Sequence, residues 1–307
     1  MKKLAKLISV LVLIIVILLY SNEIINSIKF SFSICFNSLF PSLIPFMLLS
    51  NIILNYDIVN DLNEIFKFLM KIFHVNKNVG FIFIMSIFSG SPSNATYILE
   101  SLNKGLININ DANKSLKFCH FINPIFIIFT VGYQFLGSKS IGFKILFSHF
   151  ISNIIIGLFN KNKNFNCLNN TIKINKTDKN KKENFFIILK KSILNTSNSL
   201  LLILGVITFF IIVTTLLNQL LNLNNNYKFI YGLLEITQGL NYLTYSNLNI
   251  VIKTVIASFM ISFGGLCIHL QIFCIINNKK VSYISYFISR IIHGLISSII
   301  TYIIIQY

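Results

Sequence analysis

The sequence is poor in charged residues, and acidic residues are especially few. Only 11% of its 307 residues are charged, whereas a soluble domain carries about 25% charged residues to cover its surface. This shortage excludes an ordinary soluble fold, because most of the surface must contact something other than water. Hydrophobic residues make up 54% of the chain, so the composition indicates an integral membrane protein whose main partner is the lipid bilayer.

Motifs of the common enzyme and metal-site classes are also missing. The five cysteines are scattered and odd in number, which argues against a disulfide framework, and no CxxC pair occurs. No HExxH, G-x-S-x-G or Walker A sequence is found. The net charge of +17 does not indicate a nucleic-acid partner, because the lysines lie between apolar runs and form no single basic face. We therefore expect no enzyme, no cofactor and no metal site.

Apolar runs near the length of a spanning helix recur along the chain. Residues 1–29 have a basic start and a short apolar core with no typical cleavage site, which favours an uncleaved signal anchor. Two shorter amphipathic stretches, 57–77 and 108–118, are typical of interfacial helices. The further uninterrupted runs that we expect to span the membrane are 30–54, 119–136, 141–159, 200–221 and 281–305.

Two other apolar runs are interrupted. The run 81–102 contains six consecutive small or helix-breaking residues at 89–94, and the run 250–276 is broken at 262–265. Non-helical backbone at membrane depth is stable only where protein or a water-filled cavity satisfies it. We therefore predict a re-entrant helical hairpin at each break.

The two interrupted runs occupy corresponding places in two halves of the chain, 30–159 and 192–307, joined by a Lys- and Asn-rich linker at 160–191. Paired interrupted segments are typical of transporters built from inverted repeats. The predicted fold is an all-α polytopic membrane protein with inverted-repeat halves, each holding one broken hairpin.

The lysines predict the orientation. With the N-terminus and the 160–191 linker in the cytoplasm, and both interrupted runs as hairpins, 18 of the 25 lysines fall on the cytoplasmic side of the cell membrane. In the alternative, 250–277 spans fully, which moves the C-terminus to the outside.

Five stretches carry a resemblance to a known family. They are 39–46 (LFPSLIPF), 89–92 (SGSP), 118–132, 234–239 (LEITQG) and 262–271. Together they resemble the YlbJ family of sporulation integral membrane proteins, whose nucleoside-recognition (GATE) domains are similar to the hairpin regions of concentrative nucleoside transporters. The chain departs from the family pattern at Asn94 and Asn123, where the family has glycine. The resemblance implies a role in endospore formation, in making the spore cortex.

Polar groups at the first break form one set of candidate solute-binding residues. Hydroxyls, an amide and exposed helix-end backbone there could bind a small polar solute, nucleoside-like or a cell-wall precursor. In the alternative, the small residues only let two half-helices pack closely. The candidates in this half are Ser89, Gly90, Ser91, Pro92, Asn94 and Asn123.

The second half supplies the other candidates. Glu235 is one of only nine acidic residues and lies in an apolar stretch, where a carboxylate is costly and therefore a functional candidate. A structural hydrogen bond is its alternative role. The remaining candidates are Thr237, Gly264, Gly265, His269 and Gln271.

Arg290 in the last span is expected to form a structural ion pair with Glu100 or Glu235. The function that follows is a membrane protein of endospore formation that moves or senses a small polar solute between two hairpins. The alternative is a non-transporting membrane scaffold for sporulation proteins.

Overall fold

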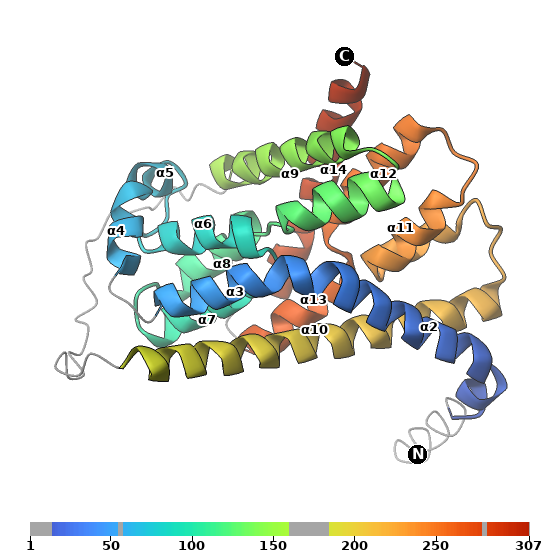
Figure 1. Cartoon of the computed structure of the whole chain (residues 1–307). Helices are drawn as coiled ribbons and strands as arrows, with labels where there is room; N and C mark the ends of the chain where they lie inside the picture. Colours follow the sequence, from blue (N-terminus) through green and yellow to red (C-terminus); the bar gives the residue numbers. More distant parts are fainter. Residues whose placement is uncertain (1–13, 55–57, 160–183, 278–280, 307) are drawn as a thin grey trace, which may run out of the picture.

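The computed structural model of the chain describes residues 14–54, 58–159, 184–277 and 281–306, and every regular element in these ranges is a helix (Figure 1). Residues 1–13 of the expected anchor and residues 160–183 of the expected linker lie outside the described residues.

The first long helix is one unit made of three elements, α2 (Ser21–Ile34), the π-helical η1 (Cys35–Leu39) and α3 (Phe40–Leu54). The wide turn of η1 ends just before Pro41, a residue that cannot donate a helix hydrogen bond. The expected boundary between residues 29 and 30 falls inside α2. No glycine or proline separates the anchor from the next span there, so the helix continues.

A second long helix, α10 (Phe185–Leu221), lies antiparallel to the first (Figure 1). Polar side chains join the two along their length, in the pairs Ser27–Thr215 (2.6 Å), Ser31–Thr208 (2.9 Å) and Asn51–Thr196 (3.0 Å). The helix begins inside the stretch expected to be a solvated linker. Residues 185–189 are all apolar and helical, although the Lys- and Asn-rich composition predicts a linker up to residue 191.

The first interruption lies where the sequence predicts it. Helix α6 (Val79–Ser89) ends at Gly90, and α7 (Ser93–Asn103) begins three residues later. The two half-helices pack against each other as a hairpin. The short helices α4 (Ile58–Ile65), α5 (Lys67–Ile72) and α8 (Ile109–Phe118) adjoin this hairpin and correspond to the two amphipathic stretches.

The structure corrects the prediction of a single span over 119–136. Residues 119–123 are non-helical, although all five are buried, and the chain becomes helical only from Pro124 through the π-helical η2 (Phe126–Phe135). A proline disfavours helical geometry in the residue before it, which here is Asn123. A third interruption therefore crosses the interior, and α9 (Lys139–Phe159) follows η2.

The second half contains η3 (Lys228–Leu233), α11 (Ile236–Thr244), α12 (Ile250–Phe263), α13 (Gly265–Ile276) and α14 (Tyr283–Gln306). The chain breaks between α12 and α13 at Gly264, whose φ of +91° is one that residues with a side chain rarely adopt. Helix α12 packs against α14 and α9, whereas α13 packs against α7 and α10. Because α12 and α13 do not pack against each other, this break lacks the hairpin packing that the sequence predicts, and Ile250–Ile276 is long and apolar enough for the alternative of a full span.

Within the part of the chain that the structure describes, five helical segments are long and apolar enough to cross a membrane, namely Ser21–Leu54, Lys139–Phe159, Phe185–Leu221, Ile250–Ile276 and Tyr283–Gln306. They expose large apolar side chains such as Phe147 and Phe209, each 57% exposed, which lipid can cover. The chain is a multi-pass helical membrane protein.

Two glycines offer a matched test of the first break. A Cβ atom at Gly90 would lie 2.7 Å from the backbone nitrogen of Asn123, and its φ is +72°, whereas a Cβ atom at Gly205 in α10 would meet open space. We expect Gly90→Ala to lower the free energy of unfolding by about 2 kcal/mol or more. Gly205→Ala should leave it unchanged or raise it by up to about 1 kcal/mol. Thermal unfolding in one detergent compares them, and equal melting temperatures would contradict the close approach.

Candidate functional site

Both halves of the chain line one internal cavity. The lining includes α3, α10, α11, α13 and the stretch from Ile122 to Phe126, and it also includes Ser91 and Pro92 of the first break. The cavity has a volume of about 50 Å³, which is room for a few water molecules. Six of the predicted site residues line it: Ser91, Pro92, Asn123, Glu235, Thr237 and Gln271.

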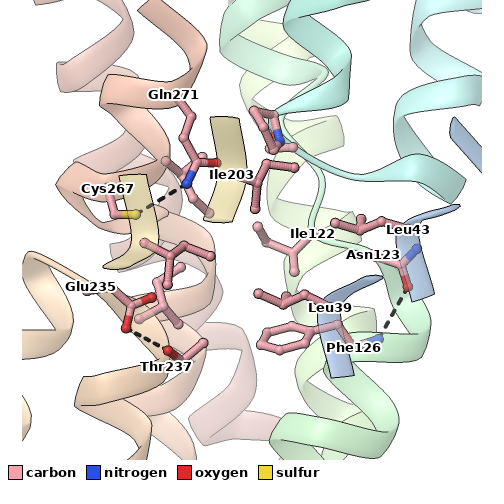
Figure 2. Close-up of a pocket in the computed structure, with 15 residues that line it drawn as sticks. Leu39, Leu43, Ile122, Asn123, Phe126, Ile203, Glu235, Thr237, Cys267 and Gln271 are labelled. Carbon is pink, nitrogen blue, oxygen red and sulfur yellow. Dashed lines mark hydrogen bonds between the residues drawn. The ribbon is translucent and has the colours of Figure 1, made fainter. Parts of the chain in front are cut away.

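The two walls of the cavity differ in character. Figure 2 shows Leu39, Leu43, Ile122 and Phe126 on one side, with Ile203 of α10 between the walls. The opposite side carries the polar groups of Glu235, Thr237, Cys267 and Gln271 (Figure 2). A solute in this space would contact apolar carbon on one side and hydrogen-bonding groups on the other.

Glu235 owes its position to helix α11. It is the N-cap residue of that helix, and its Oε2 accepts hydrogen bonds from the Thr237 hydroxyl at 2.6 Å and from the Gln238 backbone N–H at 2.7 Å. The residue is only 3% exposed. These hydrogen bonds cap its own helix, and the same carboxylate also faces the cavity (Figure 2).

The candidates of the first half use their polar groups within the protein. The Ser89 hydroxyl donates to the Met85 carbonyl at 2.8 Å, as serines inside helices often do. The amide of Asn123 donates to the carbonyls of Ser42 (2.9 Å) and Phe88 (2.7 Å), and its Oδ1 accepts from two backbone N–H groups. Asn123 therefore fastens the start of η2 to the hairpin and has little left for a solute.

The non-helical stretch 119–123 is held by groups from several elements. Its carbonyls accept hydrogen bonds from Asn94 Nδ2 at Cys119 O (3.1 Å), from Asn153 Nδ2 at His120 O (2.6 Å) and from Ser91 N at Phe121 O (2.6 Å). Buried backbone groups need such partners, because each unsatisfied one costs free energy. Asn94, predicted as a solute ligand, therefore supports this stretch.

Four of the five histidines gather beside the same stretch, and His269 is the one of them that the sequence predicts as a site residue. His120, His149 and His293 are fully buried and His269 is 1% exposed. The ring centroids of His149 and His293 lie 4.7 Å apart, and those of His120 and His293 lie 6.5 Å apart. The signal that could have revealed the group is collective: all four occur in otherwise apolar runs.

The hydrogen bonds of this histidine cluster define its protonation. The Ile122 N–H donates to His149 Nε2 at 3.1 Å, so the other ring nitrogen carries the proton and donates to the Ser262 hydroxyl at 2.9 Å. His293 accepts at Nδ1 from Arg290 (2.8 Å) and donates from Nε2 to the His149 carbonyl (3.1 Å). Both rings therefore fit their surroundings as neutral imidazoles.

His120 has the most unusual environment of the cluster. Its Nδ1 lies 3.1 Å from both the Ser91 and the Tyr286 hydroxyls, while its Nε2 is buried without a partner. Gly264 lies against that Nε2, since a Cβ atom there would approach it to 2.9 Å. Because Gly264 of the second break has no side chain, it leaves room for the His120 imidazole, which contacts Ser91 of the first break.

The expected ion pair of Arg290 is not the arrangement in the structure. Its guanidinium is fully buried and donates to the Lys117 carbonyl and to His293, and neither contact involves Glu100 or Glu235. Lys117 is in the last turn of α8, where the free carbonyls attract a positive charge. Arg290 satisfies a helix end, and no acidic side chain is needed there.

The remaining predicted residues lie near the cavity without lining it. His269 donates to the Phe263 carbonyl at 3.0 Å, and Gly265 lies against the backbone of residue 234, beside the bond from Cys267 N to Leu234 O (2.8 Å). Among the described residues, no group of three or more His, Cys, Asp or Glu side chains is arranged to hold a metal ion.

The geometry is that of a multi-pass helical membrane protein with a small cavity lined by segments far apart in the sequence. The curated sporulation integral membrane protein YlbJ of Bacillus subtilis (strain 168) is 27% identical to this chain over 112 residues. The match covers 36% of this chain and 28% of that protein, so it spans little more than a quarter of the relative's length. No family model and no solved structure matches the chain. The chain is distantly related to a sporulation integral membrane protein.

Asn153 tests whether the 119–123 stretch depends on its donors. We expect Asn153→Leu to lower the free energy of unfolding by about 1–3 kcal/mol, because the buried His120 carbonyl loses its donor. Asn37→Leu is the control, since Asn37 is exposed and bonds only to Ser33 of its own helix. Denaturant unfolding in mixed micelles measures both. If Asn153→Leu is as stable as the control, the carbonyl does not require this donor.

Proposed function

We propose that the chain takes part in endospore formation by moving or sensing a small polar solute between its two halves. The halves are 30–159 and 192–307, each a GATE-like unit with a broken helix, related as inverted repeats. The chain acts without enzymatic chemistry. It sits in the cell membrane with the 160–191 linker in the cytoplasm. A cytoplasmic N-terminus, as the sequence predicts, requires a further membrane crossing before Ser21, because Ser21 and Leu54 lie at opposite ends of one helix.

The observation that carries this proposal is the cavity lined by the first break, by the non-helical stretch 119–123 and by the start of α11. Ser91 and Pro92 of the first break, Ile122 and Asn123 of the non-helical stretch, and Glu235 at the start of α11 all line it. Broken helices expose backbone and helix ends, which is how transporters present polar groups to a solute at membrane depth. The distant similarity to a sporulation membrane protein supports the biological setting.

The cavity volume indicates in which conformational state of the protein a solute could bind. Pockets for drug-sized ligands measure about 300–1,000 Å³, far more than the 50 Å³ found here. We therefore propose that a larger solute binds in another state of the protein, in which the halves separate. Gly90 and Gly264, both at positive φ, are the positions where the backbone can most easily change direction.

The antiparallel helix pair supports the proposed orientation. It puts Leu54 and Phe185 at one end and Ser21 and Leu221 at the other. This is the relative arrangement that the lysine distribution requires for these two spans. The Lys-rich linker before Phe185 would then lie on the same side as residues 58–72.

A second candidate function is a membrane scaffold for sporulation proteins that moves no solute. One observation favours it: the Ser89 hydroxyl, the Asn94 amide N–H and the Asn123 amide form their hydrogen bonds inside the protein. A first break whose small residues served only the packing of the two half-helices would have the same internal hydrogen bonds.

Transport assays separate the two functions. We expect the purified chain in proteoliposomes to take up at least one labelled solute from a panel of nucleosides and cell-wall precursors. Glu235→Gln should slow that uptake by about tenfold or more, because a hydrogen bond to a charged group is lost. Glu64→Gln is the matched control, since Glu64 is half exposed and pairs with Lys67 and Lys77 on the surface.

The same variants test the role in the cell. Loss of sporulation in Glu235→Gln, with normal sporulation in Glu64→Gln, is the expected result. Uptake of no solute in the panel, together with normal sporulation of Glu235→Gln, would rule out the transport proposal and favour the scaffold.

A further inference from the structure

The charge of the cavity restricts what it can hold. Of the 15 residues that line it, Glu235 is the only acidic one, and no lysine, arginine or histidine is among them. Among the described residues, the ion pairs of glutamates are those of Glu64 with Lys67 and Lys77. Glu235 is therefore a buried carboxylate without a cationic side chain beside it.

Burial raises the pKa of Glu235, and the hydrogen bonds from Thr237 and Gln238 oppose that shift only in part, so the charged carboxylate still lacks one partner. The N-terminus of α11 and the Thr237 hydroxyl both stabilise negative charge at Oε2. The side chain points into the space between the two walls (Figure 2). A carboxylate removed from water needs a counter-charge, since the desolvation cost is otherwise several kcal/mol in order of magnitude.

The opposite wall determines the rest of the solute. Leu39, Leu43, Ile122 and Phe126 present only carbon to the cavity, because the polar groups of neighbouring Asn123 are used elsewhere. A solute that fills the space must therefore have an apolar part. An ion such as a phosphate would meet Glu235 as a like charge and find no basic side chain in the lining.

We propose that the cavity takes a small solute with a protonated amine, whose ammonium group contacts Glu235 while its short apolar body lies against the Leu39–Phe126 wall. The inference rests on the proposed function, because it names the solute class of the same cavity. Among the solutes of the proteoliposome panel, this inference favours amine-bearing compounds over neutral nucleosides, and it excludes phosphorylated precursors.

Cys267 provides a reporter inside the cavity. Its thiol lies on the wall of Glu235 and accepts a hydrogen bond from Gln271 at 3.3 Å (Figure 2). Methanethiosulfonates of similar size differ in charge: the 2-aminoethyl reagent is a cation, the methyl reagent is neutral and the 2-sulfonatoethyl reagent is an anion. Each forms a mixed disulfide with the thiol and releases methanesulfinate. Mass spectrometry of the full chain in liposomes follows each cysteine separately.

The rate of each reagent with Cys267 is divided by the rate of the same reagent with 2-mercaptoethanol in solution. We expect this normalised rate to be at least about tenfold higher for the cationic reagent than for the anionic one. Glu235→Gln should abolish this preference, Glu235→Asp should keep it because the charge remains, and Glu64→Gln should keep it as a remote control. Propylamine should protect Cys267 from the neutral reagent, whereas 1-propanol and propionate should not.

The outcomes separate this inference from the proposed function. Equal normalised rates for the three reagents, or protection by propanol as strong as by propylamine, would overturn the amine class and leave an accessible cavity. If no reagent modifies Cys267, the cavity is closed to solutes, and both proposals fail. A charge preference without uptake in proteoliposomes would refute transport and keep an amine-binding cavity, as a sensor requires.

Discussion

The backbone of residues 119–123 must find hydrogen-bond partners inside an apolar helix bundle, and much of the remaining structure serves that need. A helix would satisfy these groups by itself, but Pro124 and the crossing of the first hairpin prevent one. The partners come instead from Ser91 on the first break, Asn94 on α7, and His149 and Asn153 on α9. The non-helical stretch therefore ties the hairpin to α9.

The second half is tied to the first through the same region. Arg290 of α14 closes the end of α8 just before the stretch begins, and Tyr286 contacts His120 within it. Neutral histidines suit this task, because an imidazole can donate and accept at once without burying a charge. Ile122 and Asn123 of the stretch also line the cavity, and the other polar residues of its lining are Ser91, Glu235, Thr237, Cys267 and Gln271.

The breaks at 89–94 and 262–265 could be predicted because runs of glycine, serine and proline are locally incompatible with a lipid-facing helix. The break at 119–123 could not, since Cys119, Phe121 and Ile122 are as apolar as any spanning residue. What unwinds them is contact with residues far away in the sequence. The start of α10 was missed for a related reason: Lys190 and Lys191 suggest solvent, yet a helix that reaches the membrane surface can carry them. The partner of Arg290 was misjudged because a sequence shows acidic side chains and hides free helix carbonyls.

The sequence by itself determined the solvent, the helical class, the approximate spans and two of the three breaks, because composition and local hydrophobicity decide where a chain can enter lipid. It also singled out Glu235, since an acidic residue in an apolar stretch is costly. Only the tertiary structure decided which polar side chains remain available to bind a solute. Asn94 and Asn123 support backbone, four separate histidines form one cluster, and Glu235 faces a cavity without a cation. Hydrogen-bond partners and charge balance are properties of residues brought together in space, and spacing along the chain does not specify them.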